Sequence, residues 1–477
     1  MFAKKAYFNE TLKARKSMRG FYSQWDATSG TGTSGNISLA WNNVQSVSTR
    51  HFMDDFMVRL EFTFAFSCTS TAGTETIFLN KDISTAFNTL VSLSGGLSRD
   101  NSGLLSYLYK AYSEKYKSVP NYNIQDMYIY EDDGVNCDVS TTLSGAPCIK
   151  MKASKTSASF KVKTCIPVYH EYLINGVGGI TGLTIRMNFC NNLYNLIQTD
   201  ISGISGFTAT CDKASLTYTN YETPSDTFHI IAPHYDMFYV KIDASGQAVA
   251  QTRNAESTPN AVFQFITQNP NTFTGIDSNN LQKPLKIDKV VCSVNGNSNA
   301  FNTNDPFDNF SRCKSYRTGR YLGELEDWMT QNTRNGFGCV LKVDMGYLDV
   351  NQMTSETFRF ASTVNCTPGS YSNLYLYTVY CYEQEITISP TEAQSKFTAE
   401  LIGETEEYDD LYDELYIAGG WWDKVKSFGK KLISSAPGLI NKASQIASVI
   451  NPDSKAVGAL NKASDISQIL ASSTSIF

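Results

Sequence analysis

The chain has 477 residues, of which 42% are hydrophobic, 12% aromatic and 18% charged, with 40 Lys and Arg against 46 Asp and Glu and a formal net charge of -6. The apolar content is ample for a folded core and excludes global disorder. The negative balance excludes a protein that coats nucleic acid through its overall charge, although a local basic arm stays compatible with it.

The N-terminal segment is basic and short. Residues 1–20 carry six basic residues and one acid, and residues 27–36 form a Gly, Ser and Thr-rich loop. We therefore predict that residues 1–36 are a basic arm followed by a flexible loop. No apolar stretch follows the basic residues, so the segment is not a secretory signal, and we expect a protein made in the cytoplasm and not secreted. Eleven scattered cysteines without a CxxC pair agree, and we expect reduced thiols.

The body of the chain has the period-two pattern of strands. Between 59 and 68, apolar Leu60, Phe62, Phe64 and Phe66 alternate with residues facing the other way, which predicts a strand with one buried face. This strand is long enough to span lipid but has no evident pairing partner in the sequence. Further strands are expected at 159–168, 183–189, 228–242, 284–294, 340–349 and 374–382. Helical spacing is rare and predicts short helices near 83–92, 104–117 and 322–331.

These elements predict an all-β, antiparallel protein, because strands and helices do not alternate as a parallel α/β fold requires. A polar stretch at 221–228 suggests a domain boundary within the strand-rich body. It divides the body into a first β-sandwich at 37–222 and a second at 223–392, each long enough for eight strands. No sequence repeat relates the halves, so the expectation of two sandwiches rests on length.

Side chains suited to catalysis or metal binding are sparse. His229 and His234 are five positions apart, a spacing that suits neither one helical face nor one strand face, so we interpret them as core or surface histidines. Asp54 and Asp55, and the acidic run at 131–133, are interpreted as carboxylates at turns, with a calcium site as the alternative. No common catalytic or nucleotide-binding motif is present. We predict that the chain is not an enzyme and needs no metal or cofactor.

The character of the sequence changes after about Pro390. Residues 393–420 are predicted to be an acidic linker, with seven acids between 404 and 416. The linker ends in Ile417, Ala418, Gly419 and Gly420, a flexible sequence that suits a protease site or a hinge. A simple spacer before a helix is an equally good interpretation.

Residues 421–477 are predicted to form an amphipathic helical tail. Trp421, Val425, Phe428 and Leu432 lie on one helical stripe. The tail adds a second aromatic ring, Trp422, and a basic face that includes Lys424, Lys430 and Lys431. Aromatic rings beside an apolar stripe and a lysine-rich face are typical of a helix that lies in a membrane interface. Packing against the body or against a partner chain is the alternative.

The chain resembles the jelly-roll capsid proteins of non-enveloped icosahedral viruses. The resemblance rests on a Tyr, Phe and Asn-rich β body without enzyme motifs, and on a tail, WWDKVKSFGKKLISSAPGLINKASQIASVI, similar to membrane-lytic segments of adenoviruses and nodaviruses. The sequence at 417–420 is also similar to the adenovirus-type protease signal, which residues 93–96 match as well. The basic arm is shorter than the arginine-rich arms of many RNA-virus coats, which mildly favours a shell with two stacked sandwiches.

The resemblance implies a structural capsid protein that self-assembles into a virion shell with itself and other capsid subunits. It further implies that the tail disturbs a host membrane during entry and that the N-terminal arm makes weak or local genome contact. A β-sandwich receptor- or glycan-binding protein with a helical oligomerisation tail is the alternative, although Gly and Pro within the tail count against such a helix. A pore-forming protein is a third hypothesis.

Overall fold

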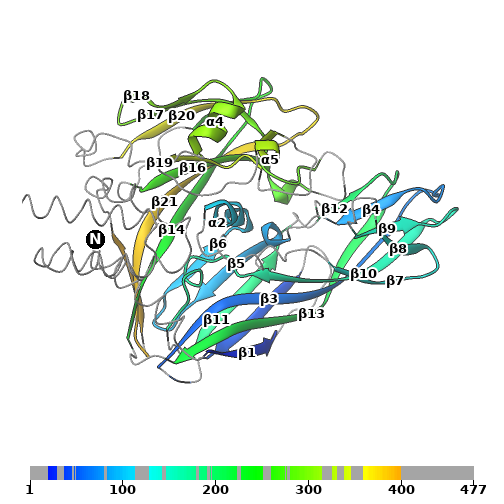
Figure 1. Ribbon diagram of the computed structural model, residues 1–477, viewed down its shortest axis with the longest axis horizontal. Coiled ribbons are helices and arrows are strands. Elements are labelled where there is room, and N and C mark those ends of the chain that lie inside the picture. The colour runs from blue at the N-terminus through cyan, green and yellow to red at the C-terminus, as the bar shows by residue number, and fades with distance from the viewer. Residues whose placement is uncertain are drawn as a thin grey trace, which may run out of the picture. The chain divides into compact units, whose positions relative to one another are not determined.

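The computed structural model describes the residues of one unit, Met1–Gly403, in part (Figure 1). The described residues are 20–28, 37–45, 48, 50–79, 83–112, 128–141, 147–178, 182–190, 194, 196–222, 227–250, 259–273, 276, 280–313, 325–329, 338–344, 358–390 and 392–398.

Two sheets enclose the first of two hydrophobic cores. One sheet has the strand order β1–β13–β3–β10–β7, the other β2–β11–β5–β6, and a smaller sheet has the order β12–β4–β9–β8. The strands are β1 Gly20–Asp26, β2 Ser38–Val44, β3 His51–Ser67, β4 Thr76–Leu79, β5 Phe87–Ser92, β6 Ser98–Asn101, β7 Tyr128–Asp132, β8 Cys137–Thr141, β9 Pro147–Met151, β10 Ser157–Pro167, β11 Leu183–Phe189, β12 Ile197–Thr199 and β13 Ser205–Glu222.

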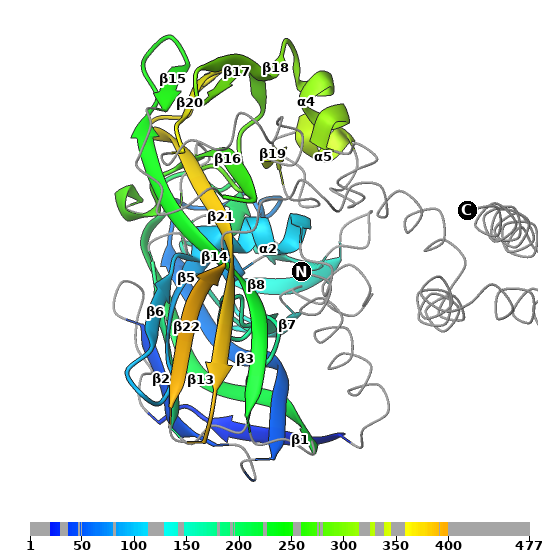
Figure 2. The same ribbon diagram turned by 90° about the vertical axis from the view of Figure 1, so that its left-hand side faces the viewer.

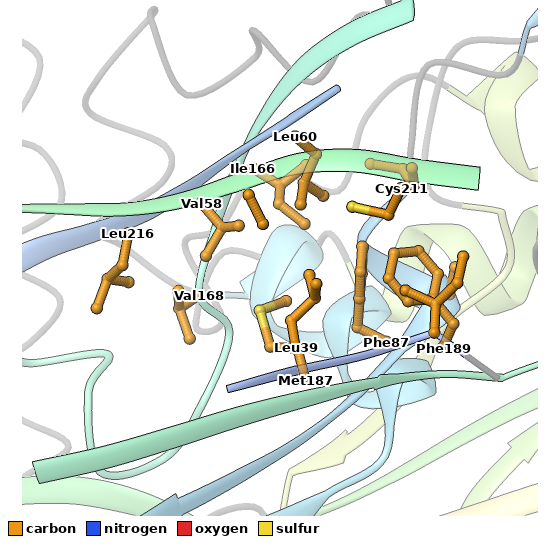
Figure 3. Packing of buried hydrophobic residues seen from close by; sticks show 14 of the residues in the cluster. Leu39, Val58, Leu60, Phe87, Ile166, Val168, Met187, Phe189, Cys211 and Leu216 are labelled. Carbon is orange, nitrogen blue, oxygen red and sulfur yellow. The ribbon is translucent and has the colours of Figure 1, made fainter. Parts of the chain in front are cut away.

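Aromatic side chains join these sheets. Phe62 on β3 is fully buried and meets Phe189 on β11, with ring centroids 5.4 Å apart and nearly perpendicular planes. Phe189 in turn contacts Phe87 on β5, at 4.1 Å, as Figure 3 shows. Because successive residues of a strand point to opposite faces, the alternation in β3 places its whole apolar row in this core.

The second core lies between two further sheets. Their strand orders are β14–β21–β16–β19, with β22 also pairing with β21, and β15–β20–β17–β18. The strands are β14 Phe228–Lys241, β15 Gln247–Ala250, β16 Ala261–Gln268, β17 Ile287–Val294, β18 Asn297–Thr303, β19 Leu341–Asp344, β20 Phe360–Cys366, β21 Leu374–Ile388 and β22 Ala393–Thr398.

The described helices are short. They are the 3₁₀ turns η1 Ser84–Ala86, η2 Gly103–Leu105 and η5 Pro270–Thr272, and the helices α2 Ser106–Tyr112, α4 Pro306–Cys313 and α5 Leu325–Met329. Within the described ranges, no helix is long and apolar enough to cross a membrane.

Both faces of strand β16 are packed against other elements. Gln264 donates a hydrogen bond to Ser362 of β20 at 2.7 Å, whereas its neighbours Phe263 and Phe265 contact Tyr112 and Tyr107 of α2. The sheet of β16 is therefore packed against the β20 sheet on one face and against α2 on the other.

Every strand pairing between described strands is antiparallel, which confirms the predicted all-β, antiparallel class. Each of the seven predicted strands overlaps a strand of the structure. The stretch at 59–68, for which the sequence shows no partner, belongs to β3 and pairs with β10 on one side and β13 on the other. Two strands, β1 and β22, lie within the segments treated above as arm and linker.

The helix predicted near 83–92 is wrong. After one 3₁₀ turn the chain forms β5, in which Phe87, Thr89 and Val91 are buried in alternation. The apolar spacing of this segment fits both periods, and pairing with β11 and β6 on either side satisfies the backbone as a strand. The helices predicted near 104–117 and 322–331 are confirmed in their described parts, as α2 and α5.

The expectation that Asp54 and Asp55 occupy a turn is also wrong. Both lie within β3, where Asp54 is buried and Asp55 has a left-handed φ of 57°. The pairing register opposite them shifts between Thr217 and Thr219, which is the signature of a β-bulge. The turn predicted at 131–133 is confirmed for Asp133, whose carboxylate accepts hydrogen bonds from the backbone N–H groups of Val135 and Asn136, whereas Glu131 and Asp132 are the last residues of β7.

Strands β14 and β21 pass through both cores. They pair along their length, from Phe228 opposite Ile388 to Lys241 opposite Tyr375 (Figure 2). At one end, Phe228 and Ile388 pack in the first core, while residues from Tyr235 onwards in β14 and before Gln384 in β21 pack in the second. One continuous ladder therefore connects the two cores.

Candidate functional site

Polar residues occupy the middle of the ladder that connects the cores. In β14, Ala232 belongs to the first core and Tyr235 to the second, and His234 lies between them. In β21, Gln384 lies between Tyr382 of the second core and Ile386 of the first. Both polar side chains are buried, so each needs a hydrogen-bonding partner at this point.

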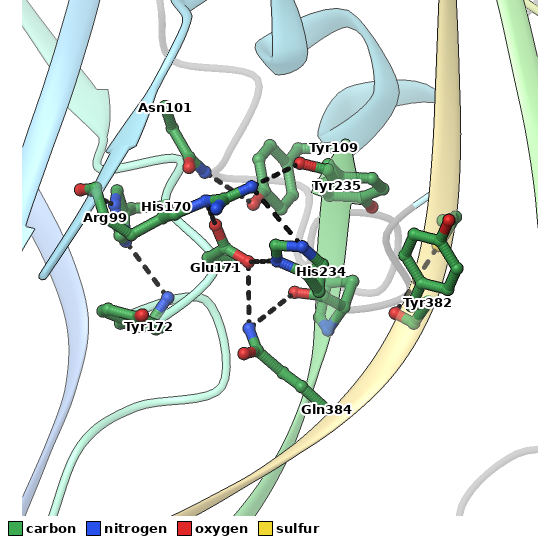
Figure 4. A network of polar contacts seen from close by, with 12 residues as sticks. Arg99, Asn101, Tyr109, His170, Glu171, Tyr172, His234, Tyr235, Tyr382 and Gln384 are labelled. Carbon is green, nitrogen blue, oxygen red and sulfur yellow. Dashed lines mark hydrogen bonds and ion pairs between the residues drawn. The ribbon is translucent and has the colours of Figure 1, made fainter. Parts of the chain in front are cut away.

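Glu171 is the centre of this polar network (Figure 4). Its fully buried carboxylate accepts hydrogen bonds from His234 Nδ1 at 2.7 Å and Gln384 Nε2 at 2.9 Å, both on Oε2. The other oxygen, Oε1, is 3.0 Å from Arg99 Nε. A buried carboxylate is tolerated only when it is paired and hydrogen-bonded, and these three donors meet that requirement.

Arg99 contacts β14 directly as well as Glu171. Its Nη2 atom donates to the carbonyl oxygen of Tyr235 at 3.1 Å and lies 3.4 Å from His234 Nε2. Because a guanidinium can only donate, His234 Nε2 must be the acceptor, which leaves its proton on Nδ1 to face Glu171. The geometry therefore assigns the neutral Nδ1–H tautomer to His234.

His170 is buried beside the network and also has both ring nitrogens engaged. Nε2 donates to the carbonyl oxygen of Arg99 at 3.0 Å, and Nδ1 accepts the backbone N–H of Tyr172 at 3.1 Å. Burial lowers the pKa of His170 to about 4, and the nearby Glu171 carboxylate offsets only part of that effect. His170 is consequently neutral at neutral pH.

The loop after β10, which carries His170 and Glu171, also contacts α2. The ring of Tyr169 stacks on Tyr109 with centroids 5.8 Å apart, and Lys110 Nζ lies 5.7 Å from the centre of the Tyr169 ring. Burial holds the pKa of Lys110 well below its ordinary value. Residues 169–171 thus contact α2, β6, β14 and β21, and we refer to these three residues as the 169–171 junction.

The arrangement fits a fixed structural joint. The Glu171 carboxylate accepts hydrogen bonds from β14 and β21 on Oε2 and forms an ion pair with Arg99 of β6 through Oε1, so its charge serves to hold those elements together. Among the described residues, no group of three or more His, Cys, Asp and Glu side chains could hold a metal ion. All eleven cysteines are described, and each is a free thiol.

The site residues predicted from the sequence lie outside the described residues. This applies to the membrane-active set Trp421, Trp422, Lys424, Val425, Phe428, Lys430, Lys431 and Leu432 and to the hinge or cleavage set Ile417, Ala418, Gly419 and Gly420. Of the two histidines singled out above, His234 is a core residue, while the side chain of His229 is 47% exposed.

Sequence reasoning missed Arg99, Glu171 and Gln384. One signal was available: His234 and Gln384 are polar residues that adjoin apolar period-two rows, Ile230 and Ala232 in one strand and Ile386 and Ile388 in the other. A polar residue in such a row needs a buried partner. Nothing in the sequence near Glu171 identifies it as that partner.

Comparison with solved structures shows which proteins share this fold. The chain superimposes on a chain of the Sputnik virophage, solved by cryo-EM at 3.5 Å resolution, with a TM-score of 0.55, 13% identity and coverage of 80% of this chain and 89% of that one. It matches the mavirus major capsid protein with a TM-score of 0.54, 10% identity and coverage of 81% and 91%. No family model and no curated protein sequence matches the chain. The chain shares the fold of these two proteins.

Proposed function

We propose that the chain is a structural capsid protein, a subunit that assembles with its own copies and with other capsid subunits into an icosahedral virus shell. The observation that carries the proposal is the fold match to the mavirus major capsid protein, which extends over 91% of that chain. In this role the protein is made in the host cytoplasm, resides in the virion and catalyses no reaction.

The body is proposed to consist of two jelly rolls. Two hydrophobic cores, each enclosed by its own pair of antiparallel sheets, support this arrangement. The continuous β14–β21 ladder and the Glu171 network connect the cores, so a force on one half of the subunit is transmitted to the other through paired backbone and through an ion pair with a buried carboxylate. A shell subunit needs such a connection, because its contacts with neighbours act on both halves.

Three further roles are proposed from the sequence alone. The tail at 421–477 disturbs a host membrane during entry, residues 417–420 are a hinge or cleavage site in front of it, and the basic arm makes local genome contact. The paired Trp residues, the apolar stripe and the lysines of the tail support the first of these roles.

Electron microscopy of the purified full chain tests the capsid proposal. We expect shells or regular capsomers in negative stain and a matching fast-sedimenting species in analytical ultracentrifugation. A second sample that ends at residue 398 should assemble equally well if the tail acts only in entry. A chain that is folded by circular dichroism but stays a single copy at every concentration and salt tested would contradict the proposal.

A further inference from the structure

We propose that the 169–171 junction is an acid-sensitive latch: when His170 gains a proton, the contact between the two cores at this point is released. This inference goes beyond the proposed capsid role and does not depend on it, since it rests only on contacts within one chain.

The hydrogen bonds of His170 allow only the neutral ring. Nε2 already carries the proton that is donated to the Arg99 carbonyl oxygen, so an added proton must go to Nδ1. Nδ1 faces the backbone N–H of Tyr172, which is a donor and cannot accept. Protonation therefore turns the hydrogen bond into a repulsive contact between two donors, the Nδ1–H of His170 and the backbone N–H of Tyr172. Because the His170 side chain is fully buried, water cannot relieve this contact.

Loss of this arrangement acts directly on the Glu171 network. Arg99 contacts this loop twice: its carbonyl oxygen accepts the His170 proton, and its guanidinium pairs with Glu171. Arg99 itself stays paired with Val91 in the β5–β6 ladder, so when the His170 ring leaves, the loop with the adjacent Glu171 moves away from the guanidinium. His234 and Gln384, the contacts of Glu171 on β14 and β21, are the next to be released.

The titratable and charged groups around His170 lie on its own loop and on the elements packed against that loop. Glu171 on the same loop favours the charged ring, and Arg99 on β6 opposes it. Tyr169 and Glu171 are the residues on either side of His170 in the chain. Lys110 on α2 lies over the ring of Tyr169, and His234 on β14 is hydrogen-bonded to Glu171. The part of β3 that hydrogen-bonds the loop at Val168 and Val177 carries Asp54 and Asp55. β21 presents the uncharged Gln384.

The balance of these effects determines the pH range. The pKa of His170 in the folded chain, about 4, is below the ordinary value of 6.5, because burial outweighs the attraction of Glu171. Between these two values the opened form binds a proton that the closed form lacks. The latch is therefore closed well above pH 6.5 and weakens by about tenfold per pH unit between 6.5 and 4, towards a limit of about 300-fold well below pH 4.

Hydrogen exchange of the full chain as a function of pH tests the latch. The variants are His170→Gln, which retains a donor for the Arg99 carbonyl but cannot be protonated, and His229→Gln, a matched change at a half-exposed histidine on β14. Protection of backbone amides at 168–176 and in the middle of β14, corrected for intrinsic exchange, should fall by up to about 80-fold between pH 6.5 and pH 4 in the wild type and in His229→Gln. It should stay level in His170→Gln.

A second measurement keeps the test decisive if His170→Gln does not fold. Deuterium exchange at the ring carbon of each histidine, followed by mass spectrometry of the wild-type chain, reports the titration of His170 directly. We expect His170 to titrate well below the ordinary histidine value of 6.5. The proposal is overturned if His170 titrates at or above 6.5, or if His170→Gln shows the same acid dependence of protection as the wild type.

Discussion

The Nδ1 atom of His234 lies 2.7 Å from the Oε2 atom of Glu171, although the two residues are 63 positions apart in the chain. This contact joins the loop after β10 to the point at which β14 leaves one hydrophobic core and enters the other. It adds a side-chain contact between the cores to the backbone connection that the β14–β21 ladder provides.

Removal of the Glu171 carboxylate should destabilise the protein strongly. Glu171→Ala leaves the donors of Arg99, His234 and Gln384 without their acceptor in a buried position, for which we expect a loss of about 3–5 kcal/mol in the free energy of unfolding. Denaturant titration of the full chain measures it. Glu385→Ala, one residue beyond Gln384 on β21 and partly exposed beside His229, is the matched control and should cost about 1 kcal/mol or less. Equal losses in the two variants would contradict the central role of Glu171.

A methyl group at Gly178 should be poorly tolerated. A Cβ atom there would stand 1.9 Å from the Phe228 ring, at the start of β14, so the ring must move. Overpacking of this kind costs about 1–3 kcal/mol. In a double-mutant cycle, Phe228→Leu should relieve part of the cost of Gly178→Ala, so the double variant is more stable than the sum of the single changes predicts. Strict additivity would show that the two residues do not contact.

The cysteines should differ widely in reactivity. Burial raises the pKa of Cys292 to about 12, which lowers its thiolate fraction by about a thousandfold relative to an ordinary thiol. Cys68 is half-buried, and its pKa is raised as well, first by burial and then by Glu75. Timed alkylation with mass spectrometry at pH 8, without reductant, should label Cys68 well before Cys292. Simultaneous labelling, or recovery of defined disulfide pairs, would contradict this order.

A peptide covering 421–450 should be disordered in buffer and helical on anionic vesicles, from which it releases a trapped dye. Replacing Trp421, Trp422 and Phe428 by Ala removes aromatic anchors worth about 1.5–3 kcal/mol each on full burial, so leakage should fall by orders of magnitude. Replacing Ser427, Ser434 and Ser435 by Ala, a matched triple change, should leave leakage intact. If the wild-type peptide neither folds on vesicles nor releases dye, the tail does not act on membranes.

The period-two rows were sufficient to predict the fold class. In β3 and β11 the apolar residue at every second position is buried in the structure, because a sheet with one packed face imposes that period on the sequence. Residues 83–92 show the limit of the method. Their apolar positions satisfy a helical and a strand period together. The pairing partners decide between them: β6, which follows β5 directly in the chain, and β11, which is distant in sequence.

The candidate site was harder to predict than the fold. Arg99, Glu171, His234 and Gln384 come from four segments, and each has an ordinary sequence environment. Their significance arises from a junction that forms only after both sheets of each core have assembled. A polar residue in a buried row indicates that a partner exists, but neither spacing nor composition identifies that partner.

The passage of β14 and β21 through both cores also constrains how the protein is synthesised. The first core takes most of its residues from the N-terminal half of the chain, yet it includes Ile386, Ile388 and Ala393. A ribosome must therefore translate nearly four hundred codons before the side chains that complete this core are available. Until then a nascent chain exposes the apolar surface that β21 and β22 will cover, which makes it a substrate for chaperones and prone to aggregation. Premature termination between the two cores would leave the first half incomplete rather than as a smaller functional protein.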